Sequence, residues 1–126
     1  MKKNIFFILL IFCGMQVFSQ KTVQINKVNA DSYFQTSEDG SKMATFIISG
    51  FNSEEEVIET EAFFRNFRGV TECGFVYDIS TGNCYCTAIF YEYADKKYFS
   101  FLLQKAGIQF IKIDNDTIPV EELKNL

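Results

Sequence analysis

The sequence contains no histidine among its 126 residues. Histidine is the side chain that most often transfers protons near neutral pH, and it is also the commonest metal ligand. Without it, a nucleophilic serine or cysteine lacks its usual basic partner. The composition therefore predicts a protein that is not an enzyme, and it excludes a metal site built from imidazole groups.

Basic residues are also scarce, because 12 Lys and Arg stand against 16 Asp and Glu, a net charge of −4. Proteins that bind nucleic acid neutralise phosphates with clustered lysine and arginine side chains. An acidic chain of this kind predicts no nucleic-acid partner.

A long hydrophobic run is missing as well. The most apolar stretch, Ile5 to Phe12, is too short to span a bilayer comfortably, and two lysines precede it. A basic start followed by a short apolar run is typical of a secretory signal peptide. We therefore predict that residues 1–19 are a signal peptide, cleaved between Ser19 and Gln20. No membrane span would remain after cleavage.

Processing would change both the charge and the location of the protein. Loss of Lys2 and Lys3 leaves 10 basic against 16 acidic residues, a net charge of −6. The exported protein would lie in the periplasm or be secreted. Lipidation at Cys13 is an alternative, but bulky Phe12 occupies the place where lipoprotein signals carry a small residue.

Downstream of residue 42, periodicity predicts alternating strands and helices. Residues 20–42 are polar and weakly patterned, and we interpret them as an N-terminal arm. Residues 43–113 form the expected domain, and 114–126 a C-terminal tail that contains the single proline. The expected elements are strands at 43–49, 70–79, 84–93 and 110–113, with helices at 53–68 and 96–106.

This βαββαβ order predicts an α+β, ferredoxin-like fold. In that fold two helices cover one face of a four-stranded antiparallel sheet, and the other face is left open.

The segment SGFNSEEEVIETEAFFRNFRGV resembles the core of the heavy-metal-associated domains of copper chaperones and metal-transporting ATPases. In that family a Gly-Met-x-Cys-x-x-Cys turn leads through a helix to a Gly-Val pair. Gly50 and Phe51 stand at the first pair of positions here, and Gly69 and Val70 at the second. The resemblance covers about residues 43–113 and implies the same ferredoxin-like fold.

The two cysteine positions of that family carry Ser53 and Glu56. A hydroxyl and a carboxylate cannot replace thiolates around a soft ion such as Cu(I), so the usual metal site is absent. Ser-x-x-Glu at a helix start is instead typical of a capping box, with Asn52 and Glu55 as an equivalent choice. A Ca²⁺ or Mg²⁺ site is an alternative, but its ligands would point in different directions around one turn.

Three cysteines remain beyond the signal peptide, and they cannot all pair within one chain. Cys73 is most simply a small core residue. Cys84 and Cys86 lie two apart on one strand, so their thiols project from the same side and could converge on Cu or Zn. Two half-buried thiols without a metal, or a thiol that pairs with another molecule, are the alternatives.

The open face of the expected sheet is apolar and aromatic, and such a patch predicts a partner. An envelope protein or a second copy of the chain could cover it. The arm could also fold back over it, using Val23, Ile25, Tyr33 and Phe34. The face comprises Ile47, Val76, Tyr85, Ile89 and Tyr91.

The sequence thus predicts a small exported module with a degenerate heavy-metal-associated-like fold. It would act through protein–protein contact and need no cofactor. The alternative is a periplasmic metal-handling or thiol protein that uses Cys84 and Cys86 to hold Cu or Zn.

Overall fold

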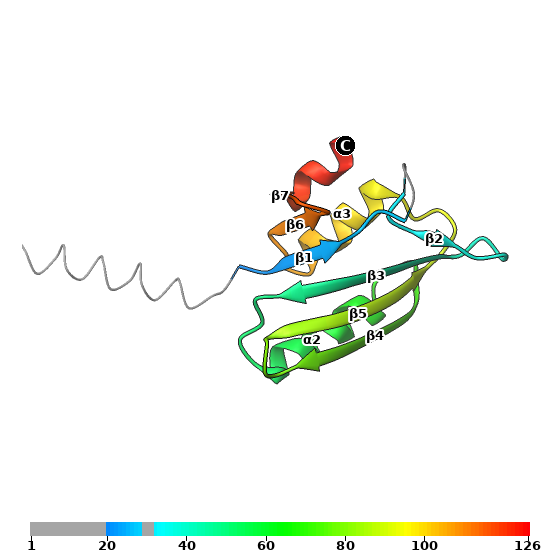
Figure 1. Ribbon diagram of the computed structural model, residues 1–126. Helices are drawn as coiled ribbons and strands as arrows, with labels where there is room; N and C mark the ends of the chain where they lie inside the picture. Colours follow the sequence, from blue (N-terminus) through cyan, green and yellow to red (C-terminus); the bar gives the residue numbers. More distant parts are fainter. Residues whose placement is uncertain (1–19, 29–31) are drawn as a thin grey trace, which may run out of the picture.

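A computed structural model describes residues 20–28 and 32–126, so the predicted signal peptide, residues 1–19, lies outside the described part. Figure 1 shows a twisted sheet with the longer helices on one side of it. The elements in order are β1 (Thr22–Ile25), β2 (Gln35–Thr36), β3 (Lys42–Ser49), α2 (Glu54–Arg65), β4 (Val70–Asp78), β5 (Asn83–Phe90), α3 (Lys96–Lys105), β6 (Phe110–Ile113), β7 (Asp116–Pro119) and the 3-10 helix η1 (Val120–Asn125).

The sheet has seven strands in the order β4-β5-β3-β1-β6-β7, with β2 paired to β3. Strand β1 is antiparallel to β3 and parallel to β6, so the sheet is mixed. The prediction of a four-stranded antiparallel, ferredoxin-like sheet with a separate arm is therefore wrong. The expected strands and helices between residues 43 and 113 do exist, but their sheet contains additional strands.

The correction has a physical cause in the segment that we interpreted as an arm. Strand β1 occupies the edge of β3 that the last strand of the expected fold would take, and Val23 and Ile25 are buried there. A strand of four residues with two inward apolar side chains gives only a weak alternation in the sequence. Its burial in the sheet is nevertheless favourable, because both of its edges find hydrogen-bonding partners.

Both helices begin at a side-chain cap and bury one apolar stripe. The Ser53 hydroxyl accepts a hydrogen bond at the start of α2, and the Asp95 carboxylate accepts one from the Tyr98 N–H at the start of α3. Such caps satisfy backbone donors that have no partner within the helix. The buried residues of the two stripes are Val57, Thr60 and Phe64 on α2 and Phe99, Ser100, Leu102 and Leu103 on α3.

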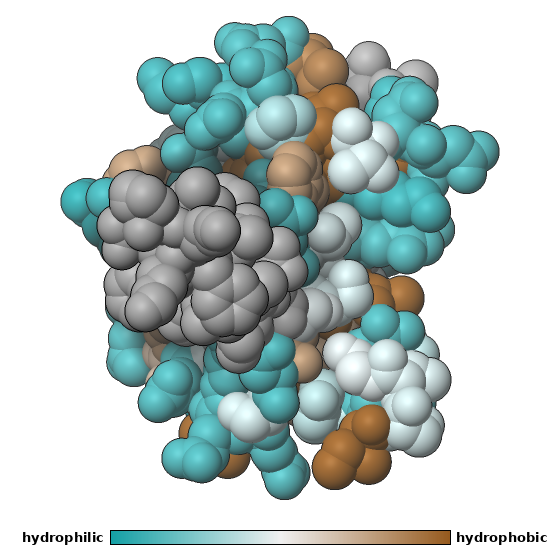
Figure 2. Space-filling model, turned by 90° about the vertical axis from the view of Figure 1, so that its left-hand side faces the viewer, coloured by the Kyte–Doolittle hydropathy of each residue, from teal (hydrophilic) through white to brown (hydrophobic). Residues whose placement is uncertain are grey.

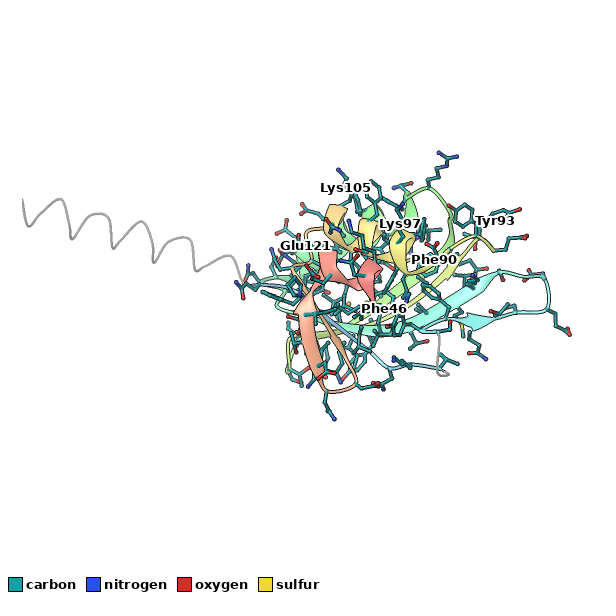
Figure 3. The ribbon with its side chains drawn as sticks, turned by 90° about the horizontal axis from the view of Figure 1, so that it is seen from above. Phe46, Phe90, Tyr93, Lys97, Lys105 and Glu121 are labelled. Atoms are coloured by element: carbon teal, nitrogen blue, oxygen red, sulfur yellow. The ribbon has the colours of Figure 1, made fainter. Side chains whose placement is uncertain are left out.

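The core lies between the sheet and these two helices. Alternate residues of β3 and β5 point into it, which leaves the other face of both strands without a covering layer (Figure 1). Phe46 and Phe90 lie in the middle of the core (Figure 3), and both rings contact Phe99 edge-on, with centroids 5.7 and 6.0 Å away. Edge-on pairs of this kind add to the hydrophobic gain of burial.

Two side chains of α2 occupy hydrogen-bonding groups on the outer edge of strand β4. Glu61 and Arg65 form an ion pair at 2.9 Å, one turn apart on the helix. The Glu61 carboxylate accepts from the Phe75 N–H at 3.0 Å, and the Arg65 guanidinium donates to the Cys73 carbonyl at 3.0 Å. These are main-chain groups that an added strand would need, so this part of the edge is protected from pairing with another chain.

Within residues 20–28 and 32–126, no helix has the length and apolar character needed to cross a membrane.

Candidate functional site

Ser53 and Glu56, the positions that the family resemblance assigns to metal ligands, form a helix cap. The Ser53 hydroxyl accepts from the Glu56 N–H at 3.2 Å, as the capping box predicts. The Glu56 carboxylate reaches back one residue further than expected and accepts from the Asn52 N–H at 2.8 Å. Both side chains are therefore engaged in holding the first turn of α2.

A lysine from the N-terminal segment lies beside this cap. The Lys21 ammonium is 2.5 Å from a carboxylate oxygen of Glu56 and 5.7 Å from the centroid of the Phe51 ring. The Lys21 side chain is only 14% exposed. A cation supplied by the chain itself thus balances the acidic start of α2, and it joins β1 to the turn before that helix.

The electrostatics of Glu56 follow from these contacts. Partial burial by itself raises the pKa of the Glu56 carboxyl, but the hydrogen bond from Asn52 and the Lys21 ammonium outweigh burial. The net effect is a pKa below the ordinary value. Glu56 is therefore an ionised structural anion at neutral pH rather than a proton donor.

Gly50 permits the close approach of the N-terminal segment to this turn. Its φ angle is +99°, and a Cβ atom at this position would lie 2.4 Å from the carbonyl oxygen of Gln20. A side chain would therefore both strain the backbone and displace the chain that leads into β1.

The two thiols that could hold a soft metal are in the core. Cys84 and Cys86 are 0% and 1% exposed, and their sulfur atoms are 3.9 Å apart. The Cys86 thiol also lies 3.5 Å from the carbonyl oxygen of Cys84. The strand does bring the pair together as expected. They lie at the turn end of the β4–β5 hairpin, but both side chains are buried there, whereas metal exchange would need an accessible thiol.

The acidity of the cysteines fits a structural role. Burial raises the pKa of the Cys86 thiol far above its ordinary value, while the hydrogen bond from Cys86 lowers the pKa of Cys84. Burial, together with the charge of Glu61, raises the pKa of the half-buried Cys73 to about 11. Because the thiolate is the reactive and metal-binding form, Cys73 and Cys86 are poorly prepared for either role at neutral pH.

Within the part of the chain that the structure describes, no group of three or more Cys, Asp or Glu side chains is arranged to hold a metal ion. Cys84 and Cys86 would have to bind an ion as a buried pair alone, and that is fewer protein ligands than zinc sites use.

The open face of the sheet is the larger candidate site. Cross-strand pairing aligns Ile47 with Tyr85 and Tyr85 with Val76, so these three side chains form one row. A second row joins Met43 to Ile89. Val76 is 68% exposed and Tyr85 is 46% exposed, which leaves large apolar area in contact with water.

This face is hollowed between its strands. A groove of about 730 Å³ lies over β3, β4 and β5 and is bordered by β1 and the segment after it. Its lining includes Thr45, Gly74, Val76, Tyr85 and Thr87, together with residues 24–28, Tyr33 and Gln35. Gly74 pairs with Thr87, and no atom lies within 4 Å of the place where a Cβ would be. The missing side chain leaves a hole beside the protruding Tyr85 ring.

Tyr91 does not belong to this face, contrary to the sequence prediction. Strand β5 ends at Phe90, and the alternation of its side chains ends with it. The Tyr91 ring packs against Tyr98 of α3 at 5.3 Å and against Tyr93 at 6.0 Å. It lies so close to Gly69 that a Cβ there would come within 2.9 Å of the ring.

The arm borders the open face and does not cover Val76 and Tyr85, which stay exposed, while residues 24–28, Tyr33 and Gln35 line one side of the groove. The residues proposed for that cover are buried in the core instead, and Phe34 contacts Phe90 and Phe99 there. The four residues are Val23, Ile25, Tyr33 and Phe34.

Charge is placed at the two ends of the face and not at its centre. Lys112 of β6 pairs with Gln24, and Gln24 pairs with Ile47, so the lysine ends the row that contains Tyr85. At the opposite end, exposed Glu72 of β4 pairs with Ile89. Among the paired strand residues of this face, the cation lies toward β6 and the anion on β4, and Lys27, just after β1, also lines the groove.

An aromatic cluster on the helix side was not predicted from the sequence. Phe67, just after α2, contacts Phe63, Tyr98 and Phe101, with ring centroids 5.6–6.0 Å apart. The four-residue spacing of Phe63 and Phe67, and of Lys97, Phe101 and Lys105, was a visible signal for one shared helix face. That the two helices bring these faces together is known only from the structure.

Where it is coloured, the face in Figure 2 carries mostly hydrophilic residues, with hydrophobic ones in small separate patches.

Comparison of the chain with known protein families gives no match, and neither do characterised proteins or solved structures. The resemblance to heavy-metal-associated domains therefore stays a prediction from the spacing of Gly50, Ser53, Glu56 and Gly69.

Proposed function

We propose that this protein is a small exported, non-enzymatic module that works through protein–protein contact at the open face of its sheet. The observation that carries the proposal is the uncovered apolar row of Ile47, Tyr85 and Val76 beside a groove. Large apolar side chains in water forgo the free energy of burial, about 1.5–3 kcal/mol for each one fully buried. Several of them together on one face favour an interface.

The occupant that fits this face best is a second copy of the same chain. The Tyr85 ring protrudes next to the hole at Gly74, so knob and hole lie on one surface, as an isologous twofold contact requires. Two sheets that pack face to face lie about 10 Å apart, which leaves room for interdigitated side chains of this size.

The charges at the two ends of the face favour the same arrangement. A twofold axis parallel to the strands places the β4 end of one copy over the β6 end of the other. Glu72 of each copy then faces the end that carries Lys112 of its partner. Opposite signs at these ends favour this orientation over the one that stacks like ends together.

The thiol and metal alternative has less support. Cys84 and Cys86 belong to the hydrophobic core and are 0% and 1% exposed. In this proposal the two cysteines fill the core below the contact surface.

The test is the oligomeric state of the exported protein, measured by sedimentation over a range of concentrations. We expect a monomer–dimer equilibrium for the parent protein, and a monomer at all concentrations for the double variant Val76→Lys with Tyr85→Lys. Ile58→Lys is the matched control, because Ile58 is 60% exposed on α2, away from the sheet face. It should leave the dimer intact.

A charge reversal distinguishes a specific twofold contact from non-specific association. Lys112→Glu should weaken the dimer by about fivefold, a typical effect of one charge at the rim of an interface, and addition of Glu72→Lys should restore most of it. A parent protein that stays monomeric, or a reversal without any rescue, would overturn self-association and leave a different protein as the occupant.

A further inference from the structure

A second surface, on the opposite side of the molecule, combines exposed phenylalanine with lysine. It consists of Phe63 and Phe67 of α2 and the segment just after it, and of Lys97, Phe101 and Lys105 of α3. Phe101 is 51% exposed and Phe63 is 37% exposed. We call these five residues the helix-side patch.

The patch is one continuous surface because of contacts between the helices. The Phe67 ring lies 6.0 Å from Phe101 and 5.6 Å from Phe63. Tyr98 packs beneath Phe67 and donates a hydrogen bond of 2.7 Å to the carbonyl of Arg68. These contacts hold the aromatic side chains at a fixed place on the outside of the fold.

The cations stand around the phenylalanine side chains. Lys97, Phe101 and Lys105 are spaced by four residues, so they follow one exposed line along α3. The Lys105 ammonium lies 5.3 Å from the centroid of the Phe101 ring. Figure 3 shows Lys97 and Lys105 on the helix side of the molecule, with Tyr93 further along.

Acidic residues lie around this patch but not within it. In α2 the run of Glu54, Glu55 and Glu56 is in the first turn, and Glu61 is paired with Arg65. In α3 the first turn contains no acidic residue, but Asp95 caps the helix, and Glu121 and Glu122 lie on η1, which packs against it. The patch itself thus combines two lysines with aromatic rings in a chain that is acidic overall.

We infer that the helix-side patch binds the surface of a membrane that contains anionic phospholipid. Phenylalanine is favourable at the boundary between headgroups and acyl chains, and lysine side chains extend from the same helix toward lipid phosphates. Each lysine close to an anionic bilayer strengthens the attraction. The groove described above lies on the other side of the sheet. The helix-side patch therefore presents protruding rings and no cavity.

This inference is independent of dimer formation, because the open face and the helix-side patch lie on opposite sides of the sheet. A dimer joined through its open faces would present two such patches, directed away from each other. Either surface can therefore be removed by substitution while the other is kept.

The test is sedimentation of the exported protein with vesicles, either of phosphatidylcholine alone or with a quarter of phosphatidylglycerol. The parent protein should bind only the anionic vesicles, and binding should fall as salt is raised. The double variant Phe101→Ser with Lys105→Glu should lose at least about tenfold in binding. Far-ultraviolet circular dichroism would verify that the variant is folded, as expected for two exposed positions.

Two controls keep the result specific. Lys124→Glu changes the net charge by the same amount as the patch variant does, but at an exposed position outside the patch, and it should keep most of the binding. All these proteins share one N-terminus, so any contribution from it is common to them. Equal loss in the control, equal binding to neutral vesicles, or no binding by the parent would overturn the inference. Retention on polyglutamate without vesicle binding would overturn it in favour of an acidic protein surface.

Discussion

The Lys21 ammonium lies 2.5 Å from the Glu56 carboxylate, and this pair joins the segment before β1 to the first turn of α2. The two residues are far apart in the sequence. Their contact connects β1, a part of the predicted arm, with the turn that resembles a metal-binding loop. The same turn is held by the Ser53 cap and by the glycine that lets residue 20 approach.

The Lys21–Glu56 pair predicts a specific loss of stability in acid. Because the pKa of Glu56 is lowered in the folded protein, its contribution is complete at neutral pH. It is lost as the pH falls below about 4.5, the ordinary value, and through the folded pKa. Denaturant unfolding of Glu56→Gln should therefore show a flatter pH dependence below that point than the parent protein. Lys21→Met should behave in the same way, whereas Lys124→Met should keep the parent profile.

The helix cap predicts a measurable cost for Ser53→Ala. Loss of the hydroxyl that accepts from the Glu56 N–H should reduce the free energy of unfolding by about 0.5–2 kcal/mol. Ser53→Asp is the control, because aspartate is an equally good cap and its charge suits a helix N-terminus. If the alanine variant unfolds at the same denaturant concentration as the parent, the cap has no energetic role.

The close approach at Gly50 predicts a large effect for the smallest substitution. Gly50→Ala would place a methyl group 2.4 Å from the Gln20 carbonyl oxygen and force an L residue to keep a φ of +99°. Together these should cost about 1–3 kcal/mol or more, observed as a lower melting temperature. Gly74→Ala has open space around its Cβ and should change stability by less than about 1 kcal/mol. Equal effects of the two substitutions would contradict the described packing.

The burial of the cysteines predicts their order of reaction with a thiol reagent. At pH 8, the folded protein should react slowly at Cys73, whose pKa is about 11, and hardly at all at Cys84 and Cys86. All three should react rapidly in guanidinium chloride. Mass spectrometry of the labelled peptides distinguishes the sites. Fast labelling of Cys84 in the folded state would show that the core opens easily, and would support the alternative of a thiol function.

Because Glu61 occupies the outer edge of β4, we predict that Glu61→Ala promotes aggregation. The increase should be larger than the loss of folding stability alone would cause. Loss of the carboxylate leaves the Phe75 N–H without its acceptor and releases Arg65 from its ion pair. An outer strand with free main-chain groups is a template for pairing with another chain. Light scattering at matched fractions of folded protein should rise for Glu61→Ala. Glu59→Ala, an exposed acidic residue on the same helix, should behave like the parent.

Much of the local structure could be predicted because it depends on near neighbours. The Ser53 cap, the stripe of Val57, Thr60 and Phe64, and the alternation along β5 are all visible as residue spacing. The same alternation placed Ile47, Val76, Tyr85 and Ile89 on one face. Tyr91 was misplaced because the alternation stops at Phe90, and the packing of Tyr91 against Gly69 and Tyr98 has no signature in the sequence.

The sequence by itself determined the type of each main element, the helix caps, the acidic charge and the lack of histidine, since these follow from single residues and short spacings. Only the tertiary structure decided that Thr22–Ile25 enters the middle of the sheet, that Cys84 and Cys86 are fully buried, and that Phe67 meets Phe101. Strand order depends on which main-chain edges find partners across the whole chain. The four residues of β1, with two apolar side chains, do not specify the position of this strand locally. Its position is specified by burial between β3 and β6.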